Sequence, residues 1–139
     1  MKKYLDGLND LLAPRHDVGL LLLRLFIGTR LVYGVIDNVV SWQHMLAFAE
    51  FLENFGFPVP VASAVLSVYV QLIAGMGILT GFQIRLASIL IVVNFVVALL
   101  MVHFPSGDSF EAMTPPLAML FGAATLMFTG PGKFSLGNR

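Results

Sequence analysis

Three long stretches of the chain contain no Asp, Glu, Lys or Arg, and this absence of charge constrains the fold more than any other feature. The stretches cover residues 54–84, 86–107 and 112–132. Each exceeds the roughly 20 residues that an α-helix needs to cross about 30 Å of hydrocarbon. Because backbone N–H and C=O groups in lipid must bond within their own segment, runs of this length are helical. The pattern therefore predicts at least three transmembrane helices.

A fourth apolar segment carries Arg24 and Arg30 among leucines, valines and aromatic residues. Its assignment to the membrane agrees with a mean hydropathy of +0.87. Charged residues make up 12% of the chain, about half the roughly 25% of an ordinary soluble protein. We predict an all-α, polytopic membrane protein built as a four-helix bundle. Its transmembrane spans are expected at about residues 18–39, 61–81, 85–104 and 112–129.

The composition also excludes several kinds of function. With no cysteine, the chain has no disulfide, no thiol nucleophile and no cysteine-ligated metal or iron–sulfur cluster. The eight basic and eight acidic residues cancel, and no basic run is present, so nucleic acid is excluded as a partner. We expect no intrinsic cofactor, which means that any redox chemistry requires a bound one.

The N-terminal segment, residues 1–17, is predicted to be cytoplasmic and to stay on the mature protein. It has the lysines of a signal peptide, but two aspartates follow and no small-residue cleavage site ends the apolar run. Residues 3–13 are expected to form a short interfacial helix that ends at Pro14. One face of this helix carries Tyr4, Leu8, Leu11 and Leu12. The remainder, residues 18–139, is predicted to be a single membrane domain.

Residues 41–55, between the first two spans, are too polar to cross the membrane but are strongly amphipathic. We predict a helix that lies on the outer surface of the bilayer. Its apolar face consists of Trp42, Met45, Leu46, Ala49 and Leu52. The Pro-Val-Pro sequence at 58–60 is expected to end this helix and to start the second span.

The charges outside the spans are sorted by side. The side that holds both chain ends carries Lys2, Lys3, Arg15, Arg85, Lys133 and Arg139. The opposite side carries Asp37, Glu50, Glu53, Asp108 and Glu111, together with His44 and His103. By the positive-inside rule we expect a multi-pass protein of the bacterial inner membrane with both termini in the cytoplasm.

The two arginines of the first span lie at different depths. A rise of about 1.5 Å per residue puts Arg24 about 9 Å and Arg30 about 18 Å beyond Val18. Arg24 is interpreted as a residue that snorkels to the headgroups, with a ligand-binding role as the alternative. A charge at the depth of Arg30 costs about 2.5–3.5 kcal/mol on translocon scales, so this residue must face protein or a wet cavity.

Gln71 and Asn94 are midway along the second and third spans, at the depth of Arg30. We expect their amide carbonyls to hold its guanidinium. The trio is then either interhelical glue or the floor of a polar pocket for an anionic or carbonyl-bearing ligand. Asp37 shares the helix face of Arg30 but lies about 10.5 Å further along the axis, so only a water or a ligand would bridge the two.

The histidines on the acidic side, His44 and His103, have carboxylates near them but no metal-ligand spacing such as HxxxH. Solvated interfacial residues are the preferred interpretation, with a metal or haem site as the alternative. No catalytic and no metal-ligating residue is assigned. The candidate ligand-binding residues are Arg24, Arg30, Asp37, Gln71, Asn94 and His103.

Four segments resemble, in order, the helices of the DoxX family of small bacterial membrane proteins. They are LLLRLFIGTRLVYG, VQLIAGMGILTG, RLASILIVVNFVVALLMVH and LMFTGPGKFSLGN, within roughly residues 18–138. The GPGKFSL ending is the most specific piece, although Pro131 and Gly132 also fit a plain helix stop and Lys133 a cytoplasmic anchor. Many family members have Lys where this chain has Asp37 and Glu where it has Gln71.

The resemblance implies a four-helix bundle and a link to respiratory or oxidative-stress redox chemistry, because name-giving members are associated with a thiosulfate:quinone oxidoreductase. We therefore expect an auxiliary membrane subunit whose pocket binds a quinone, with Arg30 bonded to a ring oxygen. The alternatives are a small-solute or proton-coupled transporter, which would need a homo-oligomer, and a non-catalytic scaffold. The expected partners are the lipid bilayer, a redox protein and further copies of the chain.

Overall fold

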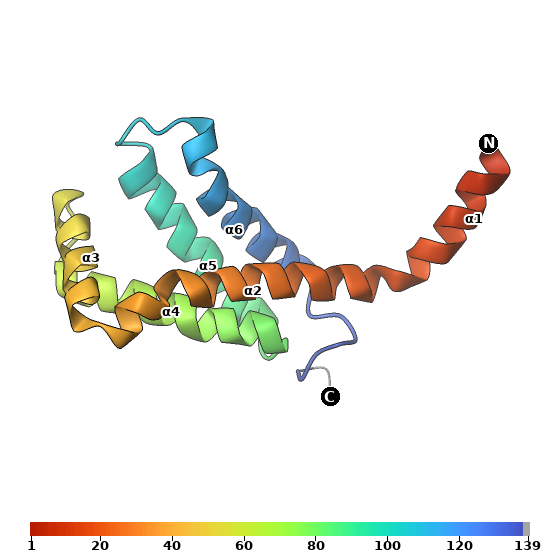
Figure 1. Ribbon diagram of the computed structural model, residues 1–139, viewed down its shortest axis with the longest axis horizontal. Helices are drawn as coiled ribbons and strands as arrows, with labels where there is room; N and C mark the ends of the chain where they lie inside the picture. The colour runs from red at the N-terminus through yellow and green to blue at the C-terminus, as the bar shows by residue number, and fades with distance from the viewer. Residues whose placement is uncertain (138–139) are drawn as a thin grey trace.

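The computed structural model describes residues 1–137, and this part of the chain is entirely helical apart from its turns and loops. The elements in order are α1 (Lys2–Leu12), the 3-10 turn η1 (Ala13–Arg15), α2 (His16–Val40), α3 (Trp42–Asn54), α4 (Pro60–Thr80), α5 (Ile84–Ala98), the π-helical turn η2 (Leu99–His103) and α6 (Phe110–Thr129) (Figure 1). Arg139, one of the basic residues assigned above, lies outside the described residues, as does Asn138 at the end of the family-like segment.

The four predicted membrane spans are confirmed. Helices long and apolar enough to cross a membrane occur at Lys2–Val40, Pro60–Thr80, Ile84–His103 and Phe110–Thr129. Helix α2 begins slightly earlier than predicted, and only the turn η1, which contains Pro14, separates it from α1. The expected helix between the first two spans is also present as α3.

The spans form two antiparallel pairs, α2 with α4 and α5 with α6. The pairs meet where α4 leads into α5, and they diverge toward the end of the bundle that carries α3 (Figure 1). We call this end the α3 side, and the end that holds α1 and residues 130–137 the terminal side. Glycines allow the close approach: a Cβ on Gly28 would lie 2.9 Å from the carbonyl oxygen of Gly75, and one on Gly122 would lie against the Ile27 side chain.

Two apolar cores hold the bundle together. The core of the terminal half contains residues of all four spans, namely Ile27, Leu31, Ala74, Ile78, Ile84, Ala87, Ile91, Met119, Ala123 and Leu126. The second core lies under α3 and consists of Val35, Met45, Ala49, Leu52, Ala64 and Val68. The first core ends where the two helix pairs separate toward the α3 side. The second core lies beyond that point and contains residues of α2, α3 and α4 only.

Helix α3 lies across the ends of α2 and α4 (Figure 1). Of its predicted apolar face, Met45, Ala49 and Leu52 are buried, whereas Trp42 and Leu46 are 59% and 42% exposed. The apolar face of α3 is therefore divided between residues that pack on protein and residues that stay exposed. Three of its residues pack on protein because the ends of α2 and α4 lie directly beneath them.

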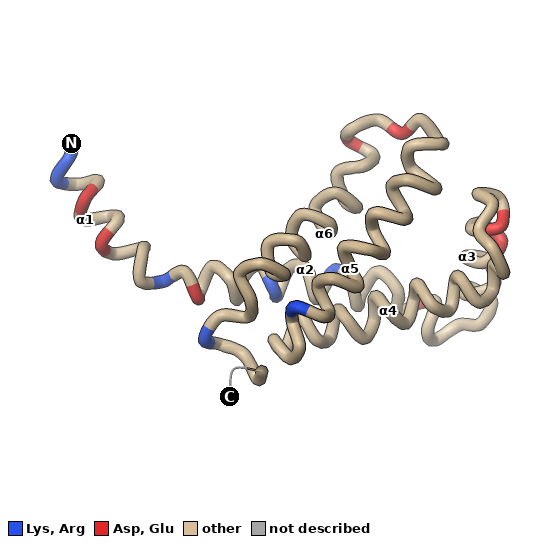
Figure 2. The backbone as a smooth tube through the Cα atoms, turned by 180° about the vertical axis from the view of Figure 1, so that it is seen from behind, with Lys and Arg blue, Asp and Glu red and all other residues tan. Residues whose placement is uncertain are grey.

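The outward faces of the spans are apolar. Phe26, Leu66, Val93 and Phe121, one from each span, are between 57% and 67% exposed. An exposed apolar surface of this extent needs an apolar surrounding, so these faces contact the lipid bilayer. Figure 2 shows acidic residues around α3 and the α5–α6 loop, and basic residues toward the terminal side, where α1 also carries acidic ones.

Candidate functional site

A cavity of about 200 Å³ lies where the two helix pairs diverge, and all four spans contribute to its walls. We call it the Arg30 cavity. Its lining consists of Arg30, Leu31, Gly34, Gln71, Phe95, His103, Pro115, Pro116 and Met119. One charged and two polar side chains thus face a space whose remaining walls are largely apolar.

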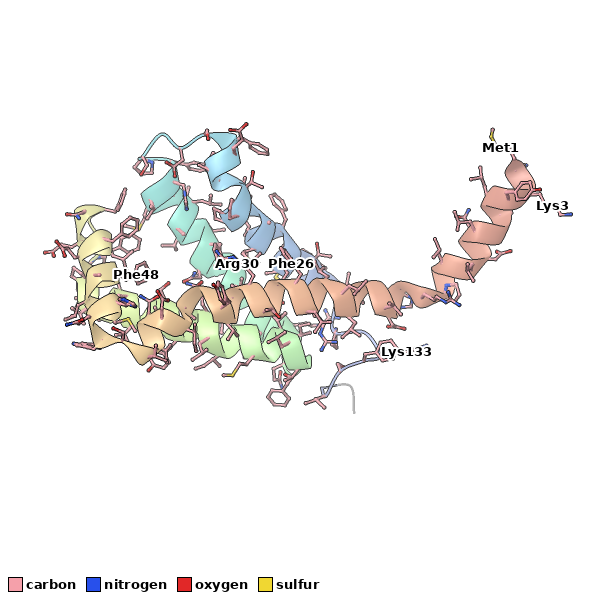
Figure 3. The ribbon with its side chains drawn as sticks, viewed as in Figure 1. Met1, Lys3, Phe26, Arg30, Phe48 and Lys133 are labelled. Carbon is pink, nitrogen blue, oxygen red and sulfur yellow. The ribbon has the colours of Figure 1, made fainter. Side chains whose placement is uncertain are left out.

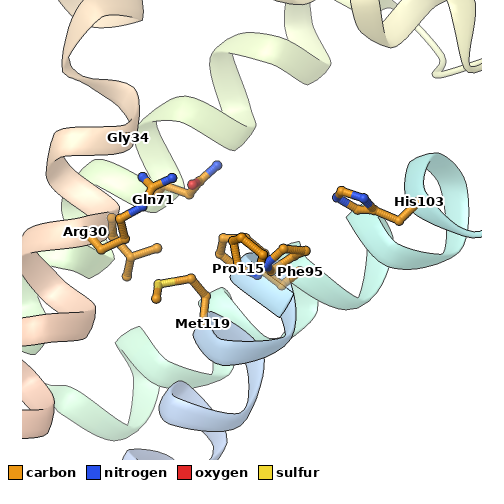
Figure 4. Close-up of a pocket in the computed structure, with 9 residues that line it drawn as sticks. Arg30, Gly34, Gln71, Phe95, His103, Pro115 and Met119 are labelled. Carbon is orange, nitrogen blue, oxygen red and sulfur yellow. The ribbon is translucent and has the colours of Figure 1, made fainter. Parts of the chain in front are cut away.

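Arg30 is exposed to this space midway along α2. In the part of the chain that the structure describes, its guanidinium has no hydrogen bond or ion pair. In Figure 4 the side chain extends toward Gln71. The guanidinium lies over Gly34, since a Cβ at that glycine would be 2.5 Å from the Arg30 Nη1. A glycine one turn further along the helix therefore makes room for the charge.

The predicted hydrogen bonds from Arg30 to Gln71 and Asn94 are not formed. Instead, Gln71 Nε2 donates to Ser67 Oγ at 3.2 Å, and that hydroxyl donates to Asn94 Oδ1 at 2.9 Å. The amides thus link α4 to α5 through Ser67, and only Gln71 also lines the cavity. Ser67 was not among the predicted site residues, although its place four residues before Gln71 puts both on one helix face.

His103 enters the same cavity from the end of α5. The chain widens there into the π-helical turn η2, in which the Phe104 N–H donates to the Leu99 carbonyl at 2.9 Å. Figure 4 shows the imidazole directed into the cavity. Its Nδ1 lies 2.7 Å from Asp108 Oδ2, with both side chains partly buried. Since the carboxylate occupies Nδ1, Nε2 is the ring nitrogen left to meet a ligand.

Asp37 lies on the α3 side and is not part of the cavity lining. Its carboxylate is 3.8 Å from Nδ1 of His44, and both side chains are about 60% exposed. Neither an ion pair nor a hydrogen bond joins Asp37 to Arg30 in the described structure, in line with the separation expected from the helix rise. Among the described residues, no cluster of three or more metal-binding side chains is present.

The interpretation of Arg24 as a snorkelling residue is wrong. Arg24 is 1% exposed. In the described structure its guanidinium donates hydrogen bonds only to backbone carbonyls. Nε donates to Ile78 at 2.9 Å, Nη2 to Leu79 at 2.8 Å, and Nη1 to Pro131 and Phe134. The last carbonyls of a helix have no intrahelical donor, so the end of α4 supplies acceptors that the headgroups would otherwise provide.

The C-terminal segment, residues 130–137, is more than a helix stop. Its carbonyls hold Arg24, and the backbone N–H of Lys133 donates to Asp17 Oδ1 at 3.0 Å. The N–H of Leu136 donates to the Thr80 carbonyl at 2.9 Å. Asp17 was not among the predicted site residues. A signal was present, because Asp17 and Arg24 are two helical turns apart and share one face.

Comparison with known proteins agrees with this architecture. The model of the DoxX family matches residues 19–104, more than half of the chain. The matched range runs from α2 to the end of η2 and contains Arg24, Arg30, Gln71, Asn94 and His103, whereas α6 and the GPGKFSL segment lie beyond it. Searches of curated proteins and of solved structures found no match. The family match and the four-span bundle together show that this chain belongs to the DoxX family.

Proposed function

We propose that this protein is an auxiliary membrane subunit of a redox system and that it binds a quinone, or a similar lipid-soluble carbonyl compound, in the Arg30 cavity. The observation that carries the proposal is the Arg30 guanidinium, which faces the cavity midway along a membrane span and has no hydrogen bond or ion pair to any residue that the structure describes. A charge at this depth is costly unless it is compensated. A ligand oxygen would supply the missing acceptor.

The lining suits the head group of a quinone. Arg30 can donate to one oxygen. With its Nδ1–H directed at Asp108, a neutral His103 presents Nε2 as an acceptor, which suits a hydroxyl of the reduced, quinol form. Leu31, Phe95 and Met119 provide apolar contact for the ring faces. The volume of about 200 Å³ is below the roughly 300–1,000 Å³ of sites for drug-sized ligands, which favours a single ring whose tail remains in the lipid.

The bound quinone would supply carbonyl groups that accept electrons, and the chain would bind and orient them. A fixed guanidinium stabilises negative charge on an oxygen strongly where water is excluded. Because the chain contains no cysteine, a thiol-based electron source would have to belong to a partner protein. This dependence on a partner is the reason for proposing an auxiliary subunit.

We also propose that the membrane is the bacterial inner membrane and that the terminal side faces the cytoplasm. The basic residues Arg15 in η1, Arg85 at the start of α5 and Lys133 after α6 lie on that side, whereas Glu50 and Glu53 in α3 and Asp108 in the α5–α6 loop lie on the α3 side. The positive-inside rule assigns the basic side to the cytoplasm. The Arg30 cavity would then open toward the periplasmic half of the bilayer.

Binding is favoured over transport by the packing of the terminal half. Ile78, Ala123 and Leu126 are 0% exposed in the core between the cavity and the terminal side. A solute would have to pass through this close-packed region. Uptake of solute by liposomes that contain the protein would therefore contradict the binding proposal and support the transporter alternative.

Titration of decylubiquinone into lipid nanodiscs that contain the protein tests the proposal, with protein-free discs as the blank. We expect saturable binding that Arg30→Gln weakens roughly 10- to 100-fold, since a hydrogen bond to a charged group contributes about 1.5–3 kcal/mol. Arg85→Gln is the matched control, because Arg85 does not line the cavity. No binding above the blank, or equal binding by a folded Arg30→Gln variant, would show that the proposal is wrong.

A further inference from the structure

Helix α1 (Lys2–Leu12) contains no buried residue. It projects from the terminal side of the bundle and lies apart from the other helices (Figure 1). The helix therefore gains no stability from tertiary packing, although an isolated helix of this length is marginal in water. Its apolar side chains therefore have no protein surface to cover them in the part of the chain that the structure describes.

The two faces of α1 differ completely in polarity. The exposed fractions on one face are 84% for Tyr4, 54% for Leu5, 50% for Leu8, 50% for Leu11 and 54% for Leu12. The opposite face carries Lys2, Lys3, Asp6, Asn9 and Asp10. Successive residues are separated by about 100° around a helix, so the two sets do not mix.

We propose that α1 lies in the headgroup region of the leaflet on the terminal side, with its apolar face in the lipid. The position of the helix supports lipid as the occupant. Only the three residues of η1 separate α1 from α2, which is the first membrane span. A 3-10 turn of this length covers about 6 Å, so the C-terminal end of α1 is tied to the membrane surface.

The orientation of α1 agrees with this placement. Figure 3 shows the Lys3 side chain directed away from the bundle. The opposite, apolar face therefore turns back toward the side on which the spans lie. A helix placed in this way has its polar residues in water and its leucines at the boundary between headgroups and acyl chains.

The charge of the helix specifies which lipid is needed. Lys2 and Lys3 are balanced by Asp6 and Asp10 on the same polar face. Basic amphipathic helices gain much of their affinity from anionic lipids, but α1 has no such excess of charge. Its attachment depends on apolar area, so a neutral phosphatidylcholine bilayer is sufficient.

Single-cysteine labelling tests this proposal in the full-length protein, because the natural chain contains no cysteine. A nitroxide is attached at Leu8→Cys and, as the matched control on the polar face, at Asp6→Cys. Power-saturation EPR in phosphatidylcholine nanodiscs then compares access of oxygen, which concentrates in lipid, with access of a water-soluble nickel chelate. We expect the oxygen-to-nickel ratio to be several-fold higher at position 8 than at position 6.

Three results would overturn the proposal. Equal access of nickel at both positions would show that α1 extends into water. Shielding of position 8 from both reagents would show that a protein covers the apolar face. In that case, dipolar broadening between labels would identify the protein as a second copy of this chain. A large increase in the ratio when phosphatidylglycerol replaces a third of the lipid would show that charge drives the attachment. None of these outcomes bears on quinone binding, which is measured separately.

Discussion

Asp17 and Lys133 are 116 positions apart in the sequence, yet the carboxylate of the first accepts the backbone N–H of the second at 3.0 Å. The Lys133 ammonium also lies 3.7 Å from the other carboxylate oxygen. Seven residues after Asp17, Arg24 binds the carbonyls of Pro131 and Phe134. Two side chains of opposite charge on one face of α2, Asp17 and Arg24, thus attach the C-terminal segment to the bundle.

The first prediction concerns this attachment. Asp17→Ala is expected to destabilise the protein by about 1–3 kcal/mol, because the Lys133 N–H loses a charged acceptor in a partly buried hydrogen bond. Asp17→Asn keeps an acceptor oxygen and should cost less, since the exposed Lys133 ammonium contributes little. Thermal unfolding in detergent, followed by circular dichroism, measures the difference. Equal melting temperatures for the natural protein and Asp17→Ala would contradict the assigned role.

The second prediction concerns Arg24. Arg24→Ala removes the donors for four backbone carbonyls and should prevent stable folding or lower the stability by several kcal/mol, since each buried acceptor left without a donor costs about 1–3 kcal/mol. Arg24→Lys should also destabilise, because an ammonium cannot reproduce the planar guanidinium fork. The yield of monodisperse protein on size exclusion reports the effect. A snorkelling arginine, in contrast, would tolerate lysine.

The third prediction concerns helix packing at Gly28. A Cβ at this position would lie 2.9 Å from the Gly75 carbonyl and 2.5 Å from Leu79 Cγ. Gly28→Ala should therefore destabilise α2 against α4 by about 1–3 kcal/mol, as overpacking does. Gly19→Ala in the same helix meets nothing within 4 Å and should stabilise by up to about 1 kcal/mol through helix propensity. Opposite shifts in melting temperature are the expected result.

The fourth prediction separates binding from stability at Gly34. A Cβ there would meet the end of the Arg30 side chain, which can move without disturbing the backbone. Gly34→Ala should therefore leave the melting temperature unchanged or raise it slightly, while weakening decylubiquinone binding several-fold. Gly19→Ala again serves as the control and should bind normally. Normal binding by Gly34→Ala would show that the observed position of the guanidinium is not the one that a ligand needs.

Much of the architecture was predictable because helices in lipid satisfy their backbone within a single segment. Local hydropathy is then enough to locate the four spans, and the 3.6-residue period is enough to locate α1 and α3. The helix between the first two spans was also predicted correctly, and Met45, Ala49 and Leu52 of its apolar face are buried. Trp42 and Leu46 lie on the same face but beyond the reach of the helices beneath it.

The candidate site was predictable only in part. Depth along the helices correctly brought Arg30 and Gln71 to one region, and both line the cavity with His103. Depth does not specify how each helix is rotated or which short polar side chain is closer. The hydrogen-bond partner of both amides, Gln71 and Asn94, is therefore Ser67 and not Arg30.

The sequence by itself determined that this is a four-span helical membrane protein, because hydrophobicity and periodicity act over neighbouring residues, and four of its segments carried the resemblance to the DoxX family. Only the tertiary structure decided which arginine is bound by the protein and which faces an open cavity. The acceptors of Arg24 come from residues 54 to 110 positions away, at the end of α4 and in a segment beyond α6. Such backbone carbonyls are present at every residue, so no sequence pattern marks the ones that the fold brings to a buried charge.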